Sequence, residues 1–363
     1  MRAMDSYASD RARVRTGSLE PGQRLPLVVE PDAPGAGLGE WVEAQPQWID
    51  AQLEQYGGVL FRGFDVPSSA EFTRAATALT PQAKVHANFY QPGNPTGGNA
   101  RTAVTYPHAR KILWHNEDNF IHTAWPRRIM FYCLTPAQQG GETPIADCRR
   151  VFELIDPSVR ERFVDRGVMY VDNLRPEFGT AWQKTFGMES REEVEAFCRK
   201  RAVQFEWVSD EWLRVRYVRP AVFRHPATRE LLWINVAHLG LLTPTQRAAW
   251  LGEFQLHELP TNSYYGDGTV IEDAVIEHIH DAYARAEVAF PWRSGDVLVL
   301  DNLLVAHGRN PFEGTRHLYA AFGERVTIVD LLAGGAASNP ELAAFCASQG
   351  IGAARASGGG GAS

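Results

Sequence analysis

The sequence lacks any run of about 18 apolar residues, the length that a membrane-spanning helix requires. Its first residues, MRAMDSYASDRARVRTG, also lack the apolar stretch of a secretory signal. Both absences argue against insertion into a membrane or transport across one. We therefore expect a soluble cytoplasmic protein.

Cysteine is scarce, and no two cysteines form a C-x-x-C pair. This spacing argues against a zinc ribbon and against a thioredoxin-like redox site. We interpret all of them as reduced thiols. They are Cys133, Cys148, Cys198 and Cys346.

A stripe of basic residues is also missing. The formal net charge of −7 comes from well-mixed acidic and basic residues, which argues against nucleic-acid binding. The chain has no glycine-rich Rossmann or P-loop motif and no visible repeat. A small-molecule partner is expected, and the sequence does not indicate an oligomeric state.

Apolar residues are plentiful, at 44% of the chain with 11% aromatic, which is ample for a large core. We predict one catalytic domain over residues 26–335. A flexible N-terminal segment, residues 1–25, precedes it, and a C-terminal tail, residues 336–363, follows. The last dozen residues are too poor in apolar side chains to offset the entropy of ordering them, so they are expected to be disordered.

The predicted secondary structure is mainly β. Short apolar runs bounded by turn residues predict strands at 57–64, 128–134, 295–302 and 316–328. Capping boxes predict the starts of helices at Ser68 with Glu71, Ser190 with Glu193, and Thr243 with Gln246. Strands cluster without regular alternation with helices, which favours a sandwich or jelly roll with flanking helices.

One long segment, residues 86–110, is rich in glycine, proline and asparagine. It is longer than a simple connection between elements, as lids over active sites tend to be. An insertion without function explains it equally well.

A first pair of metal ligands is suggested by KILWHNEDNF, in which His115 and Glu117 are two residues apart. On a strand, both side chains would project from the same face. The triplet alone is weak evidence, because it also arises by chance.

A third ligand is suggested by His307, which ends an apolar strand and precedes Gly308. Two imidazoles and one carboxylate on one face of iron(II) leave adjacent positions open for a bidentate acid and oxygen.

Arg316 follows the turn NPFEGT and should lie on the returning strand of a hairpin. Its guanidinium can bind a carboxylate through two hydrogen bonds, as the distal end of a metal-chelated 2-oxo acid requires. Thr143, in GGETP, could add a hydroxyl donor beside it.

The segments LWHNEDNF, FYCLTPAQQGGETPIAD, YGDG and GDVLVLDNLLVAHGRNPFEGTRH resemble the taurine dioxygenase family of 2-oxoglutarate oxygenases. The resemblance covers roughly residues 57–328. It is strongest to the branch that contains clavaminate synthase and the syringomycin-type aspartyl hydroxylases, in which glutamate is the iron carboxylate. A distorted double-stranded β-helix (jelly roll) of the clavaminate synthase type is implied. The resemblance also implies Fe(II) on His115, Glu117 and His307, with 2-oxoglutarate on Thr143 and Arg316 and O2 as the second co-substrate.

The branch resemblance implies hydroxylation of an amino acid or amino-acyl group in natural-product biosynthesis. Desaturation, cyclisation or another oxidative outcome remains the alternative, and the substrate could be free or presented on a carrier protein.

Two other hypotheses remain open. A zinc-dependent hydrolase or isomerase would use the same three ligands but gives Arg316 and Thr143 no role. A binding module with a structural metal would need a fourth ligand, which is not evident.

Other polar residues have weaker assignments. Arg62, Asp301 and Asn302 are interpreted mainly as buried hydrogen-bonding residues that shape the barrel. His278 and His280 lie in a predicted helix and are expected to face solvent. Residues in segments expected at the mouth of the barrel could orient a substrate: Arg101, Tyr106, Asp118, Asn119, Arg175, Trp182 and Asn235.

Overall fold

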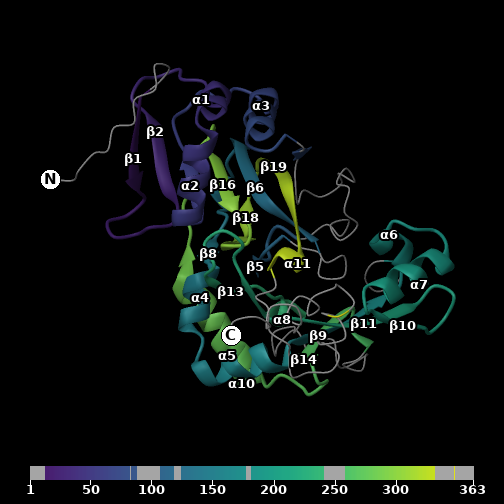
Figure 1. The fold of residues 1–363 in the computed structure, drawn as a ribbon. Coiled ribbons are helices and arrows are strands. Elements are labelled where there is room, and N and C mark those ends of the chain that lie inside the picture. Colours follow the sequence, from purple (N-terminus) through teal and green to yellow (C-terminus); the bar gives the residue numbers. More distant parts are fainter. Residues whose placement is uncertain are drawn as a thin grey trace, which may run out of the picture.

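The structure is a computed structural model that describes residues 13–81, 83–87, 107–117, 124–176, 181–240, 258–331 and 347. Its described part is mainly β, with helices packed around several sheets (Figure 1). Among these residues, no helix has the length and apolar character needed to cross a membrane. The described part of the chain therefore has the mainly β class with flanking helices that the sequence predicts.

The largest sheet has seven strands in the order β1-β2-β3-β16-β6-β19-β4. Their bounds are β1 Val14–Ser18, β2 Leu27–Pro31, β3 Gly58–Phe61, β4 Lys84–Ala87, β6 Ala124–Thr135, β16 Val297–Asp301 and β19 His317–Thr327. All neighbours are antiparallel except β2 and β3. All four strands predicted from apolar runs are confirmed as members of this sheet.

The two faces of this sheet bury side chains in two different cores. On β6, Ile129, Phe131 and Cys133 belong to the larger core, whereas Met130 and Tyr132 belong to the smaller one. This follows from the alternation of side chains along a strand. Both faces are covered, so the central strands consist of nearly continuous apolar residues.

Three helices complete the smaller core: α1 (Leu38–Ala44), α2 (Pro46–Tyr56) and α3 (Ser69–Leu79). The predicted start of α3 is confirmed, because the Ser68 hydroxyl accepts a hydrogen bond from the Glu71 N–H. The Glu71 carboxylate accepts from Gly39 N–H at 2.9 Å and so links α3 to α1.

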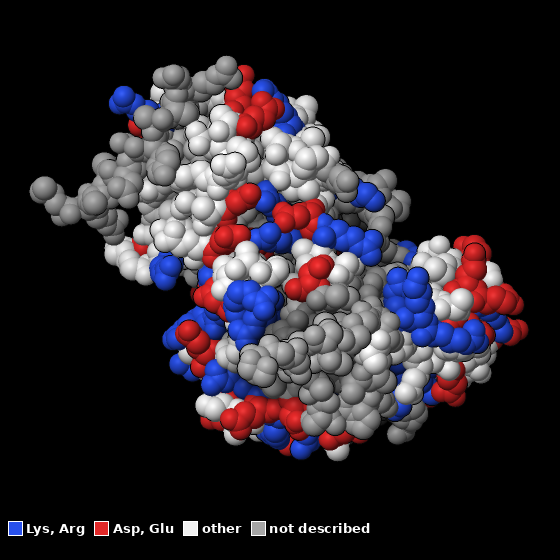
Figure 2. All heavy atoms as spheres, viewed as in Figure 1, with Lys and Arg blue, Asp and Glu red and all other residues white. Residues whose placement is uncertain are grey.

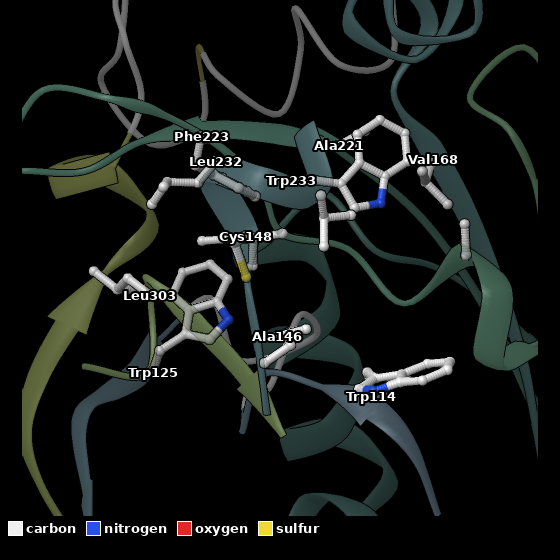
Figure 3. Close-up of a cluster of buried hydrophobic side chains, with 14 of the residues drawn as sticks. Trp114, Trp125, Ala146, Cys148, Val168, Ala221, Phe223, Leu232, Trp233 and Leu303 are labelled. Atoms are coloured by element: carbon white, nitrogen blue, oxygen red, sulfur yellow. The ribbon is translucent and has the colours of Figure 1, made fainter. Parts of the chain in front are cut away.

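A second sheet, of four strands in the order β15-β8-β17-β5, contributes to the larger core. Its strands are β5 (Ile112–His115), β8 (Ile145–Asp147), β15 (Glu287–Val288) and β17 (Val305–Arg309). Side chains of β5, β8 and β17 pack in the same core as those of β3, β6, β16 and β19. The larger core therefore lies between the two sheets, and Figure 3 shows part of it around Trp125, Cys148 and Trp233.

Among the described residues, the remaining strands form another four-stranded sheet and two two-stranded sheets, and the other elements are helices. The strands are β7 (Gln139–Gly140), β9 (Val168–Leu174), β10 (Gln204–Trp207), β11 (Leu213–Arg219), β12 (Val222–Arg224), β13 (Leu231–Trp233), β14 (Thr261–Tyr265) and β18 (Phe312–Glu313). The helices are α4 (Cys148–Leu154), α5 (Pro157–Arg166), α6 (Trp182–Phe186), α7 (Arg191–Lys200), α8 (Ala237–Gly240), α10 (Asp273–Ala286) and α11 (Ile328–Leu331). In Figure 1, α6 and α7 lie with β10 and β11 at one side of the molecule.

Other sequence predictions have mixed outcomes. The Ser190 hydroxyl caps α7 as predicted, by accepting from Glu193 N–H. β1 lies inside residues 1–25, the segment predicted to be flexible, and its register with β2 buries Val14. The predicted helix start at Thr243 and the disordered last dozen residues lie outside the described residues. On the face shown in Figure 2, acidic and basic side chains are intermixed.

Candidate metal centre and adjoining pocket

The centre of the site is a cross-strand pair of histidines. His115 on β5 lies opposite His307 on β17 in an antiparallel ladder, and their ring centroids are 4.5 Å apart. Residues directly opposite in such a ladder have side chains close enough to act together. The strand pairing thus brings together two imidazoles that are far apart in the sequence.

Beyond the histidine pair the ladder is irregular. Between the pairs His307 with His115 and Arg309 with Ile112, β5 has one residue more than β17. This count is that of a β-bulge, which re-aims neighbouring side chains. Gly308 permits the close approach of the two strands, because a Cβ there would lie 2.5 Å from the Ile112 carbonyl oxygen.

His115 presents Nε2 toward the other candidate ligands. Its Nδ1 lies 2.8 Å from the Leu113 carbonyl oxygen, which can only accept, so Nδ1 carries the proton. Nε2 then carries the lone pair and lies 3.9 Å from Glu117 Oε2. A backbone partner on the far nitrogen is the usual way of orienting a metal-binding imidazole.

His307 is buried, and among the described residues neither of its ring nitrogens has a hydrogen-bond partner. Its Nε2 lies 3.9 Å from Glu117 Oε2, the same carboxylate oxygen that His115 faces. Burial, followed by the nearby His115, lowers the pKa of His307 well below its ordinary value of 6.5. A buried neutral imidazole without a partner suits a metal ion, since a metal ligand must be deprotonated.

Glu117 completes the group, although not in the way the sequence predicts. β5 ends at His115, so the prediction that His115 and Glu117 share one strand face is wrong. Glu117 lies in the bend that follows, where the ladder no longer fixes its direction. The three side chains still converge, with ligand atoms all within 4.8 Å of one another, and therefore fit a three-ligand metal site.

A pocket adjoins the two histidines between the two large sheets. It is lined by residues of β5, β6, β17 and β19 and of the loops before β8 and β19: Ile112, His115, Phe131, Thr143, His307, Gly308, Arg309, Arg316 and Leu318. The pocket thus joins the histidines to the predicted acid-binding residues. Phe131 packs against His307, with ring centroids 5.2 Å apart.

Arg316 provides a buried positive charge in this pocket. It lies just before β19, and β17 and β19 belong to different sheets, so the prediction that Arg316 lies on the returning strand of a hairpin is wrong. Its Nε donates to the Gly141 carbonyl at 2.9 Å, and its Nη2 lies 3.5 Å from Thr143 Oγ1. Burial, followed by the charge of Arg309, lowers the pKa of Arg316 to about 10, so the guanidinium stays charged at neutral pH.

Thr143 is oriented by a residue that sequence reasoning missed. Trp292 Nε1–H donates to Thr143 Oγ1 at 3.2 Å, and both residues are buried. Because the oxygen accepts this bond, the hydroxyl proton is free to point elsewhere and to donate to a ligand. No local motif marks Trp292, since its partner is 149 positions away in the sequence.

Arg309 is a second buried guanidinium that sequence reasoning missed. Its Nη2 donates to the carbonyl groups of Pro107 and Arg110, at 2.7 and 2.9 Å. It therefore attaches residues 107–110 to β17 beside the pocket. Arg309 is two residues after His307, so the alternation of side chains along a strand places both on the same face. This spacing could have identified Arg309 as a residue of the site.

The histidines of α10 differ from expectation. His278 Nε2 accepts from Asp156 N–H at 2.8 Å, and the ring of His280 packs against His238 with centroids 5.6 Å apart. Both are half-buried, so the prediction that they face solvent is wrong. Their side chains instead fill the contacts of α10 with neighbouring elements, and neither belongs to the metal group.

The expected mouth residues have structural contacts where the structure describes them. Trp182 packs on Trp207, and Arg175 stacks on Trp212. Asn235 bridges two backbone segments through the Ala221 carbonyl and the Ala237 N–H. None of the three lines the pocket. The other four expected mouth residues lie outside the described residues: Arg101, Tyr106, Asp118 and Asn119. Most of segment 86–110 also lies outside them.

Comparison with known proteins gives a family match over most of the chain. Residues 20–322 match the family described as taurine catabolism dioxygenase TauD, TfdA family. The chain is 37% identical to the dapdiamide synthesis protein DdaC of Enterobacter agglomerans over 308 residues, covering 84% of this chain and 91% of that protein. It is 28% identical to a clavaminate synthase-like protein of Arabidopsis thaliana over 294 residues, covering 77% and 85%.

Solved structures share the fold at low sequence identity. The PvcB protein of Pseudomonas aeruginosa matches with a TM-score of 0.54 and 19% identity, covering 92% of this chain and all (100%) of that one. A second structure of PvcB, described as an Fe, alpha-ketoglutarate dependent oxygenase from an isonitrile synthetic pathway, matches with a TM-score of 0.53 and 18% identity. It covers 90% of this chain and 98% of that one.

Proposed function

The chain belongs to the TauD, TfdA family of dioxygenases, and we propose that it binds Fe(II) through His115, Glu117 and His307. The observation that carries this proposal is the convergence of three ligand atoms, one of them on a buried imidazole that has no hydrogen-bond partner in the described part of the chain. Two histidines and one carboxylate leave open positions on the metal, as non-haem iron oxygenases need. The chain is thus a 2-oxoglutarate-dependent dioxygenase of this family.

Bound iron, 2-oxoglutarate and O2 together supply the oxidising chemistry: one oxygen atom enters succinate as CO2 is lost, and the other oxidises the substrate. The residues of the chain supply position and charge. We propose that Arg316 binds the distal carboxylate of 2-oxoglutarate and that Thr143 donates its hydroxyl proton to the same group. Both side chains are buried in the pocket beside the histidines, which supports this assignment.

The fold is proposed to be a distorted jelly roll of the clavaminate synthase type. Its two sheets would be the seven-stranded sheet and the sheet of β15, β8, β17 and β5. The packing of both against one core supports this description. Residues 26–335 would form the single catalytic domain, together with β1, in a cytoplasmic protein.

The substrate class is proposed to be an amino acid or amino-acyl group in natural-product biosynthesis, with hydroxylation of an unactivated C–H bond as the reaction. The relative named as a dapdiamide synthesis protein supports a biosynthetic role. The substrate would be free or presented on a carrier protein. Desaturation or cyclisation by the same centre is the alternative, and product mass distinguishes them: hydroxylation adds one oxygen atom, whereas the others remove two hydrogen atoms.

A zinc-dependent hydrolase or isomerase is disfavoured by the pocket. A hydrolytic metal site requires no buried arginine and hydroxyl beside its open positions, whereas a chelated dicarboxylate does. The test is succinate formation from 2-oxoglutarate under O2, with protein loaded with Fe(II) or with Zn²⁺ and supplied with a panel of amino acids. Succinate with Fe(II) alone supports the proposal. Hydrolysis of amino-acyl esters, supplied in parallel to the Zn²⁺-loaded protein, together with no succinate with Fe(II), would reject it.

A further inference from the structure

The backbone of Glu117, which follows the end of β5, is held by the side chain of a residue far along the sequence. β5 ends at His115, yet the carboxylate of Glu117 must keep its position beside two imidazoles. The side chain of Asn302 accepts a hydrogen bond from Glu117 N–H at 2.8 Å and donates one to the Glu117 carbonyl at 2.7 Å. One planar amide therefore pairs with both main-chain polar groups of this single residue.

Asn302 is itself fixed on every polar group. Its Nδ2 also donates to the Pro126 carbonyl at 2.8 Å, and its own N–H donates to the Arg127 carbonyl at 2.7 Å. Its carbonyl accepts from Asn116 Nδ2 at 2.6 Å. Asn302 is fully buried, so these bonds form away from water, where breaking one leaves an unsatisfied group.

The turn that carries Asn302 is also held by side-chain hydrogen bonds. Asp301 Oδ1 accepts from the N–H groups of Leu303 and Leu304, at 2.9 and 3.3 Å. Its Oδ2 accepts from Arg127 Nε at 3.2 Å and from His225 Nε2 at 3.1 Å. His225 Nδ1 accepts from Thr228 N–H, so the proton lies on Nε2 and points at the carboxylate. The buried network therefore sets the place from which Asn302 reaches Glu117.

We propose that Asn302 is a positioning residue for the metal centre, which pre-organises the Glu117 carboxylate by clamping the Glu117 backbone N–H and carbonyl. The inference rests on the proposed role of Glu117 as a metal ligand. Asn302 acts before any metal binds, because its bonds to Glu117 belong to the polypeptide alone. Loss of such a supporting group typically weakens metal binding roughly 10–100-fold.

Two substitutions test the clamp. Asn302→Ala removes both bonds to Glu117, and Asn302→Asp keeps the size and the acceptor but removes the donor. Asn173→Ala is the matched control, since Asn173 is equally buried, bonds the Leu259 carbonyl and lies on β9 in a separate sheet. The readouts are Co²⁺ affinity by absorption titration and the free energy of unfolding of metal-free protein. If Asn302→Ala does not fold, Asn302→Asp alone is used for both measurements.

Both Asn302 variants should bind Co²⁺ roughly 10–100-fold more weakly than the wild type, while Asn173→Ala keeps wild-type affinity. The decisive readout is the same substitution in a Glu117→Ala background. There Asn302→Ala should cause no further loss, because the group that it positions is gone. A purely structural role would weaken binding by the same factor in both backgrounds, and that result would overturn the inference.

Failure of the proposed function gives a different pattern. If Glu117→Ala alone binds Co²⁺ as tightly as the wild type, Glu117 is not a ligand, and the proposed function and this inference both fall. If Glu117→Ala weakens binding but Asn302→Ala and Asn302→Asp do not, only the inference falls.

Discussion

His115 lies directly opposite His307 across the β5/β17 ladder, with ring centroids 4.5 Å apart and both Nε2 atoms 3.9 Å from one oxygen of Glu117. The relationship makes metal binding depend on strand register. A slip of one residue would turn one imidazole to the opposite face of the sheet. Changes that separate β5 from β17 should therefore weaken metal binding even where no ligand is altered.

Gly308→Ala is the sharpest such change. The added Cβ would lie 2.5 Å from the Ile112 carbonyl oxygen, a backbone atom that cannot move without separating the strands. We expect a loss of stability of roughly 1–3 kcal/mol, as for other overpacked sites, and weaker Co²⁺ binding. Urea unfolding and metal titration measure the two effects. Gly17→Ala is the control, because this strand position has open space around it. Equal effects of both substitutions would show that the close approach of β5 and β17 at Gly308 does not support metal binding.

Trp292→Phe should weaken 2-oxoglutarate binding without weakening metal binding. The substitution removes the N–H that donates to Thr143 Oγ1, so the hydroxyl loses its fixed orientation. One neutral hydrogen bond contributes about 1 kcal/mol, so the Kd for 2-oxoglutarate should rise about fivefold. Calorimetric titration of the Co²⁺-loaded protein measures it. Trp41→Phe, a buried tryptophan of the smaller core, serves as the control. An unchanged Kd in Trp292→Phe would show that Thr143 needs no such support.

The stability of the metal-free protein should fall in mild acid partly because of His238. Burial, followed by the nearby His280, lowers the pKa of His238 to about 3 from an ordinary value of 6.5. Between these values the unfolded chain binds a proton that the folded protein does not. The free energy of unfolding therefore decreases as pH falls from about 6.5, by up to about 1.4 kcal/mol per pH unit for this group.

His238→Gln should flatten that pH dependence between about pH 6 and pH 4. Urea unfolding of metal-free protein at several pH values measures the slope. His317→Gln, at a half-buried position, is the control for losing one imidazole. A slope that His238→Gln leaves unchanged would mean that the imidazole is protonated in the folded protein.

Much of the fold and of the candidate site followed from local patterns. Apolar runs predicted four strands of the large sheet, because strands buried on both faces have few polar residues. The ligand types and Arg316 were predicted because their chemistry is specific. The direction of Glu117 was predicted from an ideal strand, and that failed because β5 ends two residues earlier.

The supporting residues were harder to predict. Asn302 bonds a residue 185 positions away and Trp292 one 149 positions away, so each role depends on tertiary packing rather than on a local motif. The prediction places His280 in solvent because the helical period of the apolar residues identifies the centre of the buried face of α10. That period does not show how far the buried face extends around the helix. The ring of His280 is half-buried against His238.

This pocket is proposed to hold iron and 2-oxoglutarate together. The most direct test is anaerobic absorption spectroscopy of metal-free protein to which Fe(II) and then 2-oxoglutarate are added. We expect a weak visible charge-transfer band in the wild type. It should be lost or weakened in Arg316→Ala and kept in Arg219→Ala, which removes a buried arginine of β11. If the wild type binds iron but shows no such band, the pocket does not hold 2-oxoglutarate on the metal.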